Sequence, residues 1–357
     1  MTGVRHSSAP APTARDLGFR MPAEWAPHAS TWTAWPHDDG QWIGMLEPVR
    51  REFAALVAAI ARSEPVDLLV ADEESGEDAR RRLSFAGQGV RFHLVPHQDV
   101  WLRDSGPIFV TRGDEVALTD WEFNGWGGKY PAALDNAIPT AVSRLLGGIR
   151  PFLPGIVLEG GSIEVNGAGH ALTTRQCLLA PSRNPRLTER GIETVLRDTL
   201  GIDSVLWLDE GLEGDHTDGH IDTLTRFVTE TTIVTSRADE TADRNHAVLA
   251  ANLERLRRAR TSAGSPFRIV ELPVPAAPVE FEGERLPLTY ANFYITNGSV
   301  VVPTYGVPED AAALAILRPL FPTREIVPLS ARALITGGGA FHCVTQQQPA
   351  GRLWSAP

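Results

Sequence analysis

The most reactive side chain of this 357-residue chain stands in an unusual stretch, GGGAFHCVTQQQP at 337–349. Cys343 is one of two cysteines, and three glycines and His342 precede it. Glycine lets a backbone pass where a side chain would collide, and a thiolate is a strong nucleophile. A lone cysteine is also an ordinary core residue. Its chemistry therefore depends on which other groups reach it.

Four further stretches carry groups that can hold charge or protons. They contain Asp104 in WLRDSGP, Glu159 in LEGGSI, His220 and Asp222 in TDGHID, and Asn292 in YANFYITNG. Asp104 and Glu159 each have an ordinary alternative. Asp104 precedes Ser-Gly-Pro and could cap a turn, and Glu159 could be a solvated strand end.

The spacing of two pairs of residues indicates which histidine acts as the base for Cys343. His220 and Asp222 are two residues apart, so on a strand both side chains would share one face. His342 and Cys343 are adjacent and would point to opposite faces of a strand. We therefore expect His220 to be the base, and His342 to pack behind the site.

A thiol among several carboxylates has a specific chemical requirement. The carboxylates raise the pKa of the thiol and suppress the thiolate unless a cation neutralises them. A planar guanidinium pairs bidentately with carboxylates and leaves its central carbon open to sulfur. The residue set therefore predicts hydrolysis of a guanidine without a metal or cofactor.

The elements that must position these groups recur along the chain. β-rich segments begin at Val90, Arg150, Ser204, Phe267 and Arg324, at intervals of about 60 residues, and each is followed by a second β-like segment. Helical patterns cover 186–200, 242–259 and 308–321. The chemical residues fall in the loop after the first strand of each unit, so units arranged around an axis would bring them into one pocket.

The amino-terminal part of the chain completes this organisation. The strand-like STWTAWP and a helix at 46–62 are expected to complete the unit that holds Cys343. Because no low-complexity linker interrupts the chain, we expect a single α/β domain over 17–357 and a flexible tail over 1–16.

Composition limits the partners of the chain. Its formal charge of −11 argues against nucleic acid and mildly favours a cationic ligand. We find no apolar run of the ~20 residues that a membrane helix needs, and no secretion signal. Two cysteines do not form a disulfide framework, so we expect reduced thiols in the cytoplasm. The sequence leaves open whether the chain forms a homo-oligomer.

Six motifs in order along the chain resemble the agmatine deiminases of the guanidino-group-modifying (pentein) superfamily, which includes bacterial peptidylarginine deiminases. They are MPAEWAPHASTWTAWPHD, WLRDSGPIFV, LEGGSIEVNG, TDGHID, YANFYITNGSVVVPTYG and GGGAFHCVTQQQP. The resemblance implies a five-bladed α/β propeller with pseudo-fivefold symmetry and a central active site. It also implies a place in polyamine metabolism, in putrescine biosynthesis.

The resemblance also implies roles for the residues that match these motifs. Cys343 would be the nucleophile, His220 the acid/base, and Asp104 and Asp222 the guanidinium clamps. Glu159 would order the guanidinium or the catalytic water, and Trp101 would form an apolar wall along the substrate. The implied reaction converts agmatine to N-carbamoylputrescine and ammonia through a covalent amidino-cysteine.

The opposite end of the substrate is an amine in agmatine. The loop GLEGDHTDGH holds acidic residues and no lysine or arginine, so Asp218 or Asp215 is expected to contact this amine. The glycines around Gly338 are expected to let backbone approach the substrate.

Three alternatives stay open. Peptidylarginine or another guanidine could be the substrate. His216, His220 and Asp222 could hold zinc if HTDGHID were helical, but Gly219 disfavours a helix and the zinc hypothesis gives Cys343 no task. A non-catalytic propeller could bind a cation, but such a module has no need for a thiol.

Overall fold

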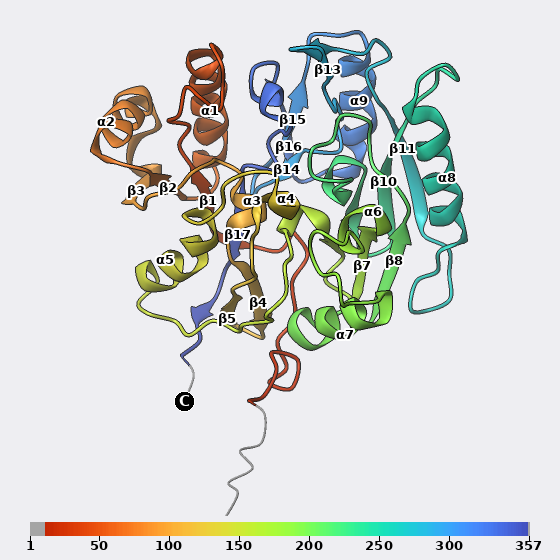
Figure 1. Ribbon diagram of the computed structural model, residues 1–357, viewed down its shortest axis with the longest axis horizontal. Coiled ribbons are helices and arrows are strands. Elements are labelled where there is room, and N and C mark those ends of the chain that lie inside the picture. Colours follow the sequence, from red (N-terminus) through yellow and green to blue (C-terminus); the bar gives the residue numbers. More distant parts are fainter. Residues whose placement is uncertain (1–10, 356–357) are drawn as a thin grey trace, which may run out of the picture.

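The strands form a repeated set of small sheets. Within residues 11–355, which the computed structural model describes apart from the side chains of 85, 86 and 88, there are five sheets of three or four strands and one two-stranded hairpin. No sheet in this part of the chain closes on itself. Together with the helices, the sheets make a mixed α/β fold (Figure 1).

Each sheet has a definite strand order. The first is β17 (Gln346–Pro349), β1 (His28–Ala34), β2 (Val66–Val70) and β3 (Val90–Leu94); the second is β18 (Arg352–Leu353), β5 (Glu115–Thr119) and β4 (Ile108–Arg112). The third is β6 (Glu164–Val165), β7 (His170–Thr174) and β8 (Ser204–Leu208), the fourth is β11 (Arg268–Pro273), β10 (Thr232–Arg237) and β9 (Thr225–Thr229), and the fifth is β14 (Tyr294–Ile295), β15 (Ser299–Thr304) and β16 (Glu325–Ser330). The hairpin is β12 (Glu280–Phe281) and β13 (Glu284–Arg285).

All five sheets share one pairing pattern. One interior strand of each sheet pairs antiparallel with one neighbour and parallel with the other, as β10 does with β9 and β11, and the four-stranded sheet adds β2, which is parallel to both β1 and β3. The same holds for β1, β5, β7 and β15. The repeat expected from the spacing of β-rich segments is therefore present in the sheet topology.

Four of the five predicted first strands are confirmed as β3, β8, β11 and β16. The prediction at Arg150 is wrong: Phe152 and Val157 make only isolated bridges to Thr119 and Glu122. Pro151 and Pro154 explain this difference, because proline lacks the N–H that a strand ladder needs. The expected completion of the Cys343 unit is confirmed, since β17 pairs with β1.

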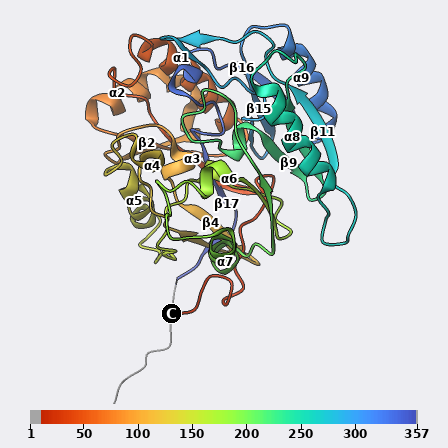
Figure 2. The ribbon, with the colours of Figure 1, turned by 45° about the vertical axis from the view of Figure 1, so that its right-hand side comes forward.

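Helices cover the sheets from outside. The longer ones are α1 (Leu46–Ala61), α2 (Glu73–Arg82), α5 (Ile138–Leu145), α7 (Glu189–Leu200), α8 (Asn245–Arg258) and α9 (Glu309–Leu317). Short helices are α3 (Leu102–Ser105), α4 (Gly125–Gly128) and α6 (Arg175–Leu178). Figures 1 and 2 both show α8 and α9 at the periphery and α3 near the middle. None of the described helices is both long and apolar enough to cross a bilayer.

The predicted helices keep their places but begin later or end earlier. Thr188 caps α7 by accepting a hydrogen bond from Gly191 N, and Gly201 ends it with a φ of 69°. Serine and threonine caps and a left-handed glycine are the usual helix boundaries. The start expected at 186 therefore moves to Glu189.

The structure of the amino-terminal segment differs from the flexible tail predicted for residues 1–16. Residues 1–10 lie outside the described part of the chain, but 11–16 pack against α7. Ala14 is buried, Arg15 N donates to Asp198 O at 3.0 Å, and the Arg15 guanidinium pairs with Asp203 at 2.8 Å. The boundary expected after residue 16 is therefore wrong, because apolar burial and an ion pair hold this segment.

Candidate active site

Five polar side chains come from five connections that lead from one sheet to the next. Asp104 lies in α3 between β3 and β4, and Glu159 lies before β6. His220, Asn292 and Cys343 precede β9, β14 and β17. The sequence placed these residues after the first strand of a unit; for Asp104, His220, Asn292 and Cys343 the pairing shows that this strand is the last of its sheet, whereas Glu159 follows only isolated bridges.

The connections bring the side chains into direct contact. The Cys343 thiol donates to Asp222 Oδ2 at 3.5 Å, and Asn292 Nδ2 donates to Cys343 Sγ at 3.1 Å. On the other side, His220 Nδ1 lies 3.6 Å from Asp104 Oδ1. All five side chains are almost completely buried. Residues scattered over the chain thus form one cluster.

Asp104 does not cap its own turn. Its Oδ1 accepts from Gly161 N at 2.9 Å, and its Oδ2 accepts from Trp126 Nε1 at 2.9 Å. A Cβ on Gly161 would lie 2.7 Å from both Asp104 Oδ1 and His220 Nδ1. Glycine is therefore required at 161 for the carboxyl and imidazole to approach, and the turn-cap alternative for Asp104 is wrong.

His220 and Asp222 reach the site from a turn, not from a strand. The segment Ile221–Thr223 is a 3₁₀ helix that begins directly after His220. Asp215 holds the preceding turn, because its carboxylate accepts from Thr217 N at 2.8 Å and from His220 N at 3.1 Å. The strand predicted here is wrong because these local hydrogen bonds compete with a ladder.

The electrostatics of the cluster suit a thiol that is neutral before substrate arrives. Burial, followed by the charges of Asp222 and Asp104, raises the pKa of Cys343 well above its usual value. Burial, followed by the charge of Asp222, also raises that of Asp104. The pKa of His220 falls to about 3, mainly through burial. These shifts favour the protonated form of Asp104 and the neutral forms of the imidazole and the thiol.

Asp222 is the exception among these groups. Burial alone would raise its pKa, but the hydrogen bond and charge of His342 hold it below the usual value. His342 Nδ1 lies 2.7 Å from Asp222 Oδ2. The site therefore contains one carboxylate that is ionised before any cation binds.

Glu159 belongs to a separate chain of charges. Arg183 Nε donates to both its carboxylate oxygens, at 2.8 and 3.1 Å, and both side chains are fully buried. Arg183 also pairs with Asp218 at 2.8 Å, and Lys129 Nζ pairs with Asp218 at 2.6 Å. Arg183 and Lys129 were not singled out in the sequence, where no local pattern connects them to Glu159.

The expected amine contacts are not free for that role. Lys129 and Arg183 occupy the two oxygens of Asp218, and Asp215 is committed to the turn before His220. Neither residue lines the cavity over Cys343. The prediction of Asp218 or Asp215 as an amine contact is therefore corrected, because ion pairing and turn formation satisfy these carboxylates.

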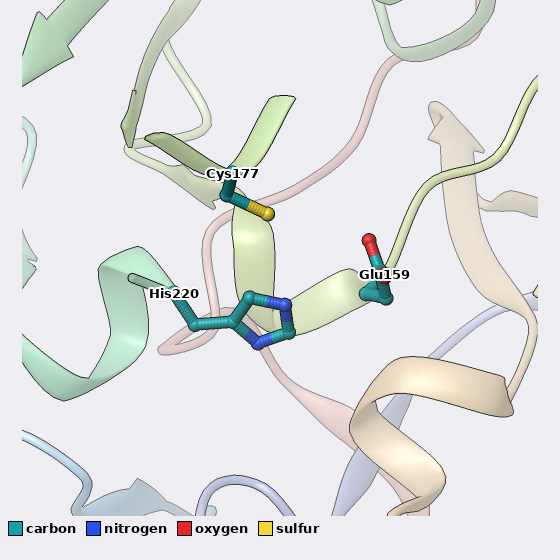
Figure 3. A group of neighbouring side chains, drawn as sticks. All are labelled: Glu159, Cys177 and His220. Atoms are coloured by element: carbon teal, nitrogen blue, oxygen red, sulfur yellow. The ribbon is translucent and has the colours of Figure 1, made fainter. Parts of the chain in front are cut away.

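Cys177 lies beside the site on the far side of His220. Ligand atoms of Glu159, Cys177 and His220 lie within 4.8 Å of one another. Figure 3 shows one ring nitrogen of His220 turned towards Cys177 and Glu159, and the other turned away from them. These residue types could hold a metal ion, but Arg183 already binds Glu159, and its positive charge opposes a cation there.

The zinc set expected as an alternative is not assembled. His216 lies on an exposed turn, where its Nδ1 contacts Tyr130 Oη at 2.9 Å and its Nε2 contacts Glu284 at 3.0 Å. His216 and His220 are not on a common helix. The hypothesis of zinc on His216, His220 and Asp222 is therefore wrong.

A cavity of about 870 Å³ leads from the surface to Cys343 and Asp104. Its apolar walls include Trp42, Trp101 and Trp126, and the rings of Trp42 and Trp101 lie 5.9 Å apart. Trp101 thus lies where the sequence analysis placed an apolar wall. Trp126 was missed, although tryptophan among glycines in GWGGKY was a visible signal.

The glycines of GGGAFHC explain how Cys343 reaches this cavity. A Cβ on Gly337 would lie 2.5 Å from Trp42 Cζ3, and one on Gly339 would lie 3.1 Å from Cys343 Sγ. Gly338, which lines the cavity, has a φ of 96° that favours glycine. All three positions therefore exclude larger residues, and the backbone itself forms part of the cavity wall.

Comparisons with known proteins agree on one family. The family described as Porphyromonas-type peptidyl-arginine deiminase matches residues 20–349. Agmatine deiminase of Ectopseudomonas mendocina is 39% identical over 95% of this chain and 97% of its own. Agmatine deiminase of Enterococcus faecalis superposes with a TM-score of 0.90 at 30% identity, covering 96% of this chain and 99% of its own. That of C. jejuni, solved with substrate bound, has a TM-score of 0.87 at 29% identity and coverages of 93% and 97%.

Proposed function

The chain belongs to the Porphyromonas-type peptidyl-arginine deiminase family and, within it, to the agmatine deiminases, and from this premise we propose that it hydrolyses agmatine to N-carbamoylputrescine and ammonia. The observation that carries the proposal is a buried thiol between two carboxylates at the end of a cavity. Within residues 11–355, Asp104 has no arginine or lysine partner. A guanidinium supplies the missing charge.

Substrate binding would change the charge state of the site. One guanidinium brings a positive charge between Asp104 and Asp222, which favours the ionised forms of Asp104 and Cys343. The thiol proton passes to neutral His220, and the Cys343 thiolate attacks the guanidinium carbon. The thiol is thus activated only when its substrate is present.

The remaining steps need only this histidine and a water molecule. Imidazolium His220 gives its proton to the departing ammonia as the C–N bond breaks, which leaves an amidino-cysteine. Water then loses one proton to His220 and attacks the same carbon. The C–S bond breaks as sulfur takes that proton back, and the second water proton leaves for the released ammonia as the ureido C=O forms. General acid/base help contributes ~10²–10⁴-fold, so positioning by the carboxylates must supply much of the remainder.

Two further residues fit roles around the reacting carbon. Glu159 lies beside His220, and we assign it the ordering of the guanidinium or the catalytic water (Figure 3). Trp101 and the backbone at Gly338 line the cavity, where they would contact the methylenes of the substrate.

The outer part of the cavity favours an amine over a carboxylate. Asp38, Asp99, Glu282 and Glu284 line it. Arg285 lines it as well, but its guanidinium is paired with Glu213 at 3.2 Å and Asp243 at 2.8 Å. This acidic rim replaces Asp218 and Asp215 as the expected partner of the amine. Ureido-product formation from agmatine, L-arginine and arginine peptides at equal concentration tests the choice, and a faster rate on peptides would favour a peptidylarginine deiminase.

The finer architecture follows from the same site. We propose that the five sheets are blades of a propeller with pseudo-fivefold symmetry, in one catalytic domain, because five equivalent connections contribute to one cavity. Two free thiols fit the reducing cytoplasm. A homo-oligomer is compatible with this arrangement.

Mass spectrometry gives the direct test of the mechanism. Protein quenched during turnover with agmatine should carry an amidino adduct on the peptide that contains Cys343. An adduct confined to the Cys177 peptide would contradict the assignment of the nucleophile.

A further inference from the structure

His342 stands directly behind the site, and it is not needed for the bond changes described above. We propose that His342 is a positioning residue: an imidazolium, held between Glu24 and Asp222, that keeps Asp222 ionised and aims its second oxygen at the substrate. The inference rests on the proposed function, in which Asp222 grips the guanidinium.

The two short contacts of the His342 ring require two protons between the ring and its carboxyl partners. His342 Nδ1 lies 2.7 Å from Asp222 Oδ2, and His342 Nε2 lies 2.7 Å from Glu24 Oε2. The His342 side chain is only 2% exposed. An ionised carboxylate only accepts hydrogen bonds, and a neutral imidazole has one N–H. Either the ring carries both protons or one of the carboxyls is protonated.

The surroundings of Glu24 place the second proton on the ring. Arg226 pairs with Glu24 Oε2 at 2.8 Å, Arg103 lies 3.6 Å from it, and Ile295 N donates to Oε1 at 2.8 Å. Although burial raises the pKa of Glu24, the charges of Arg226, His342 and Arg103 hold it well below its usual value. The pKa of Asp222 is also lowered, first by His342 and then by His220 and Arg226, so an ionised Asp222 and a charged His342 stabilise each other.

The charges of this buried network balance with an imidazolium when Asp222 is ionised. Glu164 completes it by pairing with Arg226 at 2.9 Å. The groups that face the Asp222–His342–Glu24 chain are Arg226, Arg103 and Glu164 behind it and His220, Cys343 and Asp104 on the side of the cavity. Three carboxylates then oppose two guanidiniums and His342. With Asp222 ionised, a neutral ring would leave one uncompensated charge in the interior, which is costly.

The contacts of the two Asp222 oxygens show how His342 orients this carboxylate. His342 and Cys343 both contact its Oδ2, whereas Oδ1 is buried without a hydrogen-bond partner in the described residues. A buried unpaired acceptor is unfavourable unless a ligand satisfies it. His342 thus fixes one oxygen and leaves the other for an N–H of the guanidinium.

One amide fixes this histidine relative to the nucleophile. Asn292 Oδ1 accepts from His342 N at 3.1 Å and from Cys343 N at 3.3 Å, while its Nδ2 donates to Cys343 Sγ at 3.1 Å. The charge on His342 and the sulfur of Cys343 are therefore held in one rigid turn.

The pH dependence of His342→Gln tests the proposal by kinetics. Loss of the imidazolium raises the pKa of Asp222, so a larger fraction of Asp222 is protonated at low pH and the acid limb of kcat/KM moves to higher pH. We expect a movement of at least about one pH unit and a loss of about tenfold to hundredfold at neutral pH. Glu24→Gln should move the limb in the same direction by less, because the ring can still donate to Asp222.

His28→Gln is the matched control. His28 is also buried between two acceptors, with Glu64 Oε1 at 3.0 Å and Glu24 O at 2.7 Å, but it does not line the cavity. It should lower the denaturation midpoint without moving the acid limb. Equal movement of the limb in both histidine variants would overturn the proposal, because general destabilisation would then explain it.

Nitrogen-15 spectra of histidine-labelled protein test the charge without any turnover. At pH 8 an ordinary histidine, with a pKa of about 6.5, is neutral. We expect an imidazolium signal at this pH that His342→Gln removes and His28→Gln retains. If His342→Gln does not fold, assignment in the intact protein through the ring protons replaces it. A neutral ring at His342 overturns the proposal even if agmatine is hydrolysed, whereas a charged ring in a protein inactive on agmatine overturns only the proposed function.

Discussion

The charged residues on the two sides of His220 differ in their exposure to solvent. On one side, Asp222 and Cys343 are backed by His342, Glu24 and Arg226, all buried. On the other, Glu159 and Cys177 are backed by Arg183, Asp218 and Lys129, and the last of these is 39% exposed. Salt screens exposed pairs far more than buried ones. The first side can hold a fixed charge for catalysis, while the second is partly open to the medium.

The largest difference between the two sides is expected when their cysteines, Cys343 and Cys177, are replaced. Cys343→Ala should lower kcat for agmatine by at least about 10⁴-fold, because it removes the nucleophile. Ammonia release and circular dichroism of the same sample check this result. A thiol-alkylating reagent should stop the native enzyme, and a bound guanidine should protect it. Retained activity in Cys343→Ala would refute the mechanism.

The next test concerns the two carboxylates that face the substrate. Asp104→Asn and Asp222→Asn preserve shape but remove a charge that pairs with the guanidinium, and a charge-assisted pair contributes about 1.5–3 kcal/mol. We expect kcat/KM to fall by well over tenfold in both variants. Steady-state kinetics with agmatine measure this, with Asp120→Asn as a control, because Asp120 accepts from Thr140 and does not contact the catalytic cluster. Near-normal kinetics for Asp104→Asn would remove Asp104 from the clamp.

Lys129, at the exposed end of the ion-pair network that includes Glu159, should affect catalysis less than Asp104 or Asp222. Lys129→Met breaks a pair with Asp218, and exposed pairs contribute about 0.2–1 kcal/mol. We expect kcat/KM to change by less than about fivefold, and we expect high salt to imitate the variant in the native enzyme. Measurement of both at low and high ionic strength decides this. A loss as large as that of His342→Gln would show that the two sides are equally sensitive.

The smallest effect is expected at Cys177. Cys177→Ala removes a buried thiol that the proposed reaction does not use, so agmatine turnover should stay within about twofold while stability falls by about 1 kcal/mol. Dialysis of the native enzyme against a strong chelator should likewise leave the rate unchanged. Loss of activity on chelation that zinc restores would mean that Glu159, Cys177 and His220 hold a functional metal.

The sequence indicated which residues lie together better than it indicated their local structure. Asp104, His220 and Cys343 could be found because each follows a recognisable strand and carries reactive chemistry. The turn at His220 was mistaken for a strand, because the hydrogen bonds from Asp215 that form it depend on side-chain geometry. Arg183 was missed since its pairing with Glu159 is tertiary. Asp218 was misassigned for the same reason: acidic residues in a loop do not reveal which cations will neutralise them.

The pairing of β17 with β1 has a consequence during protein synthesis. Trp32 Nε1 on β1 donates to Gln348 on β17, a partner that the ribosome adds 316 residues later. Asp104, Glu159 and His220 have all been translated by then, but β1 still lacks its neighbour and the thiol is absent. Contacts over such separations form slowly. We therefore expect a nascent chain to be inactive until β17 has paired with β1. In a product truncated before β17, no strand would follow Cys343 to fix its position, and β1 would expose an unpaired edge.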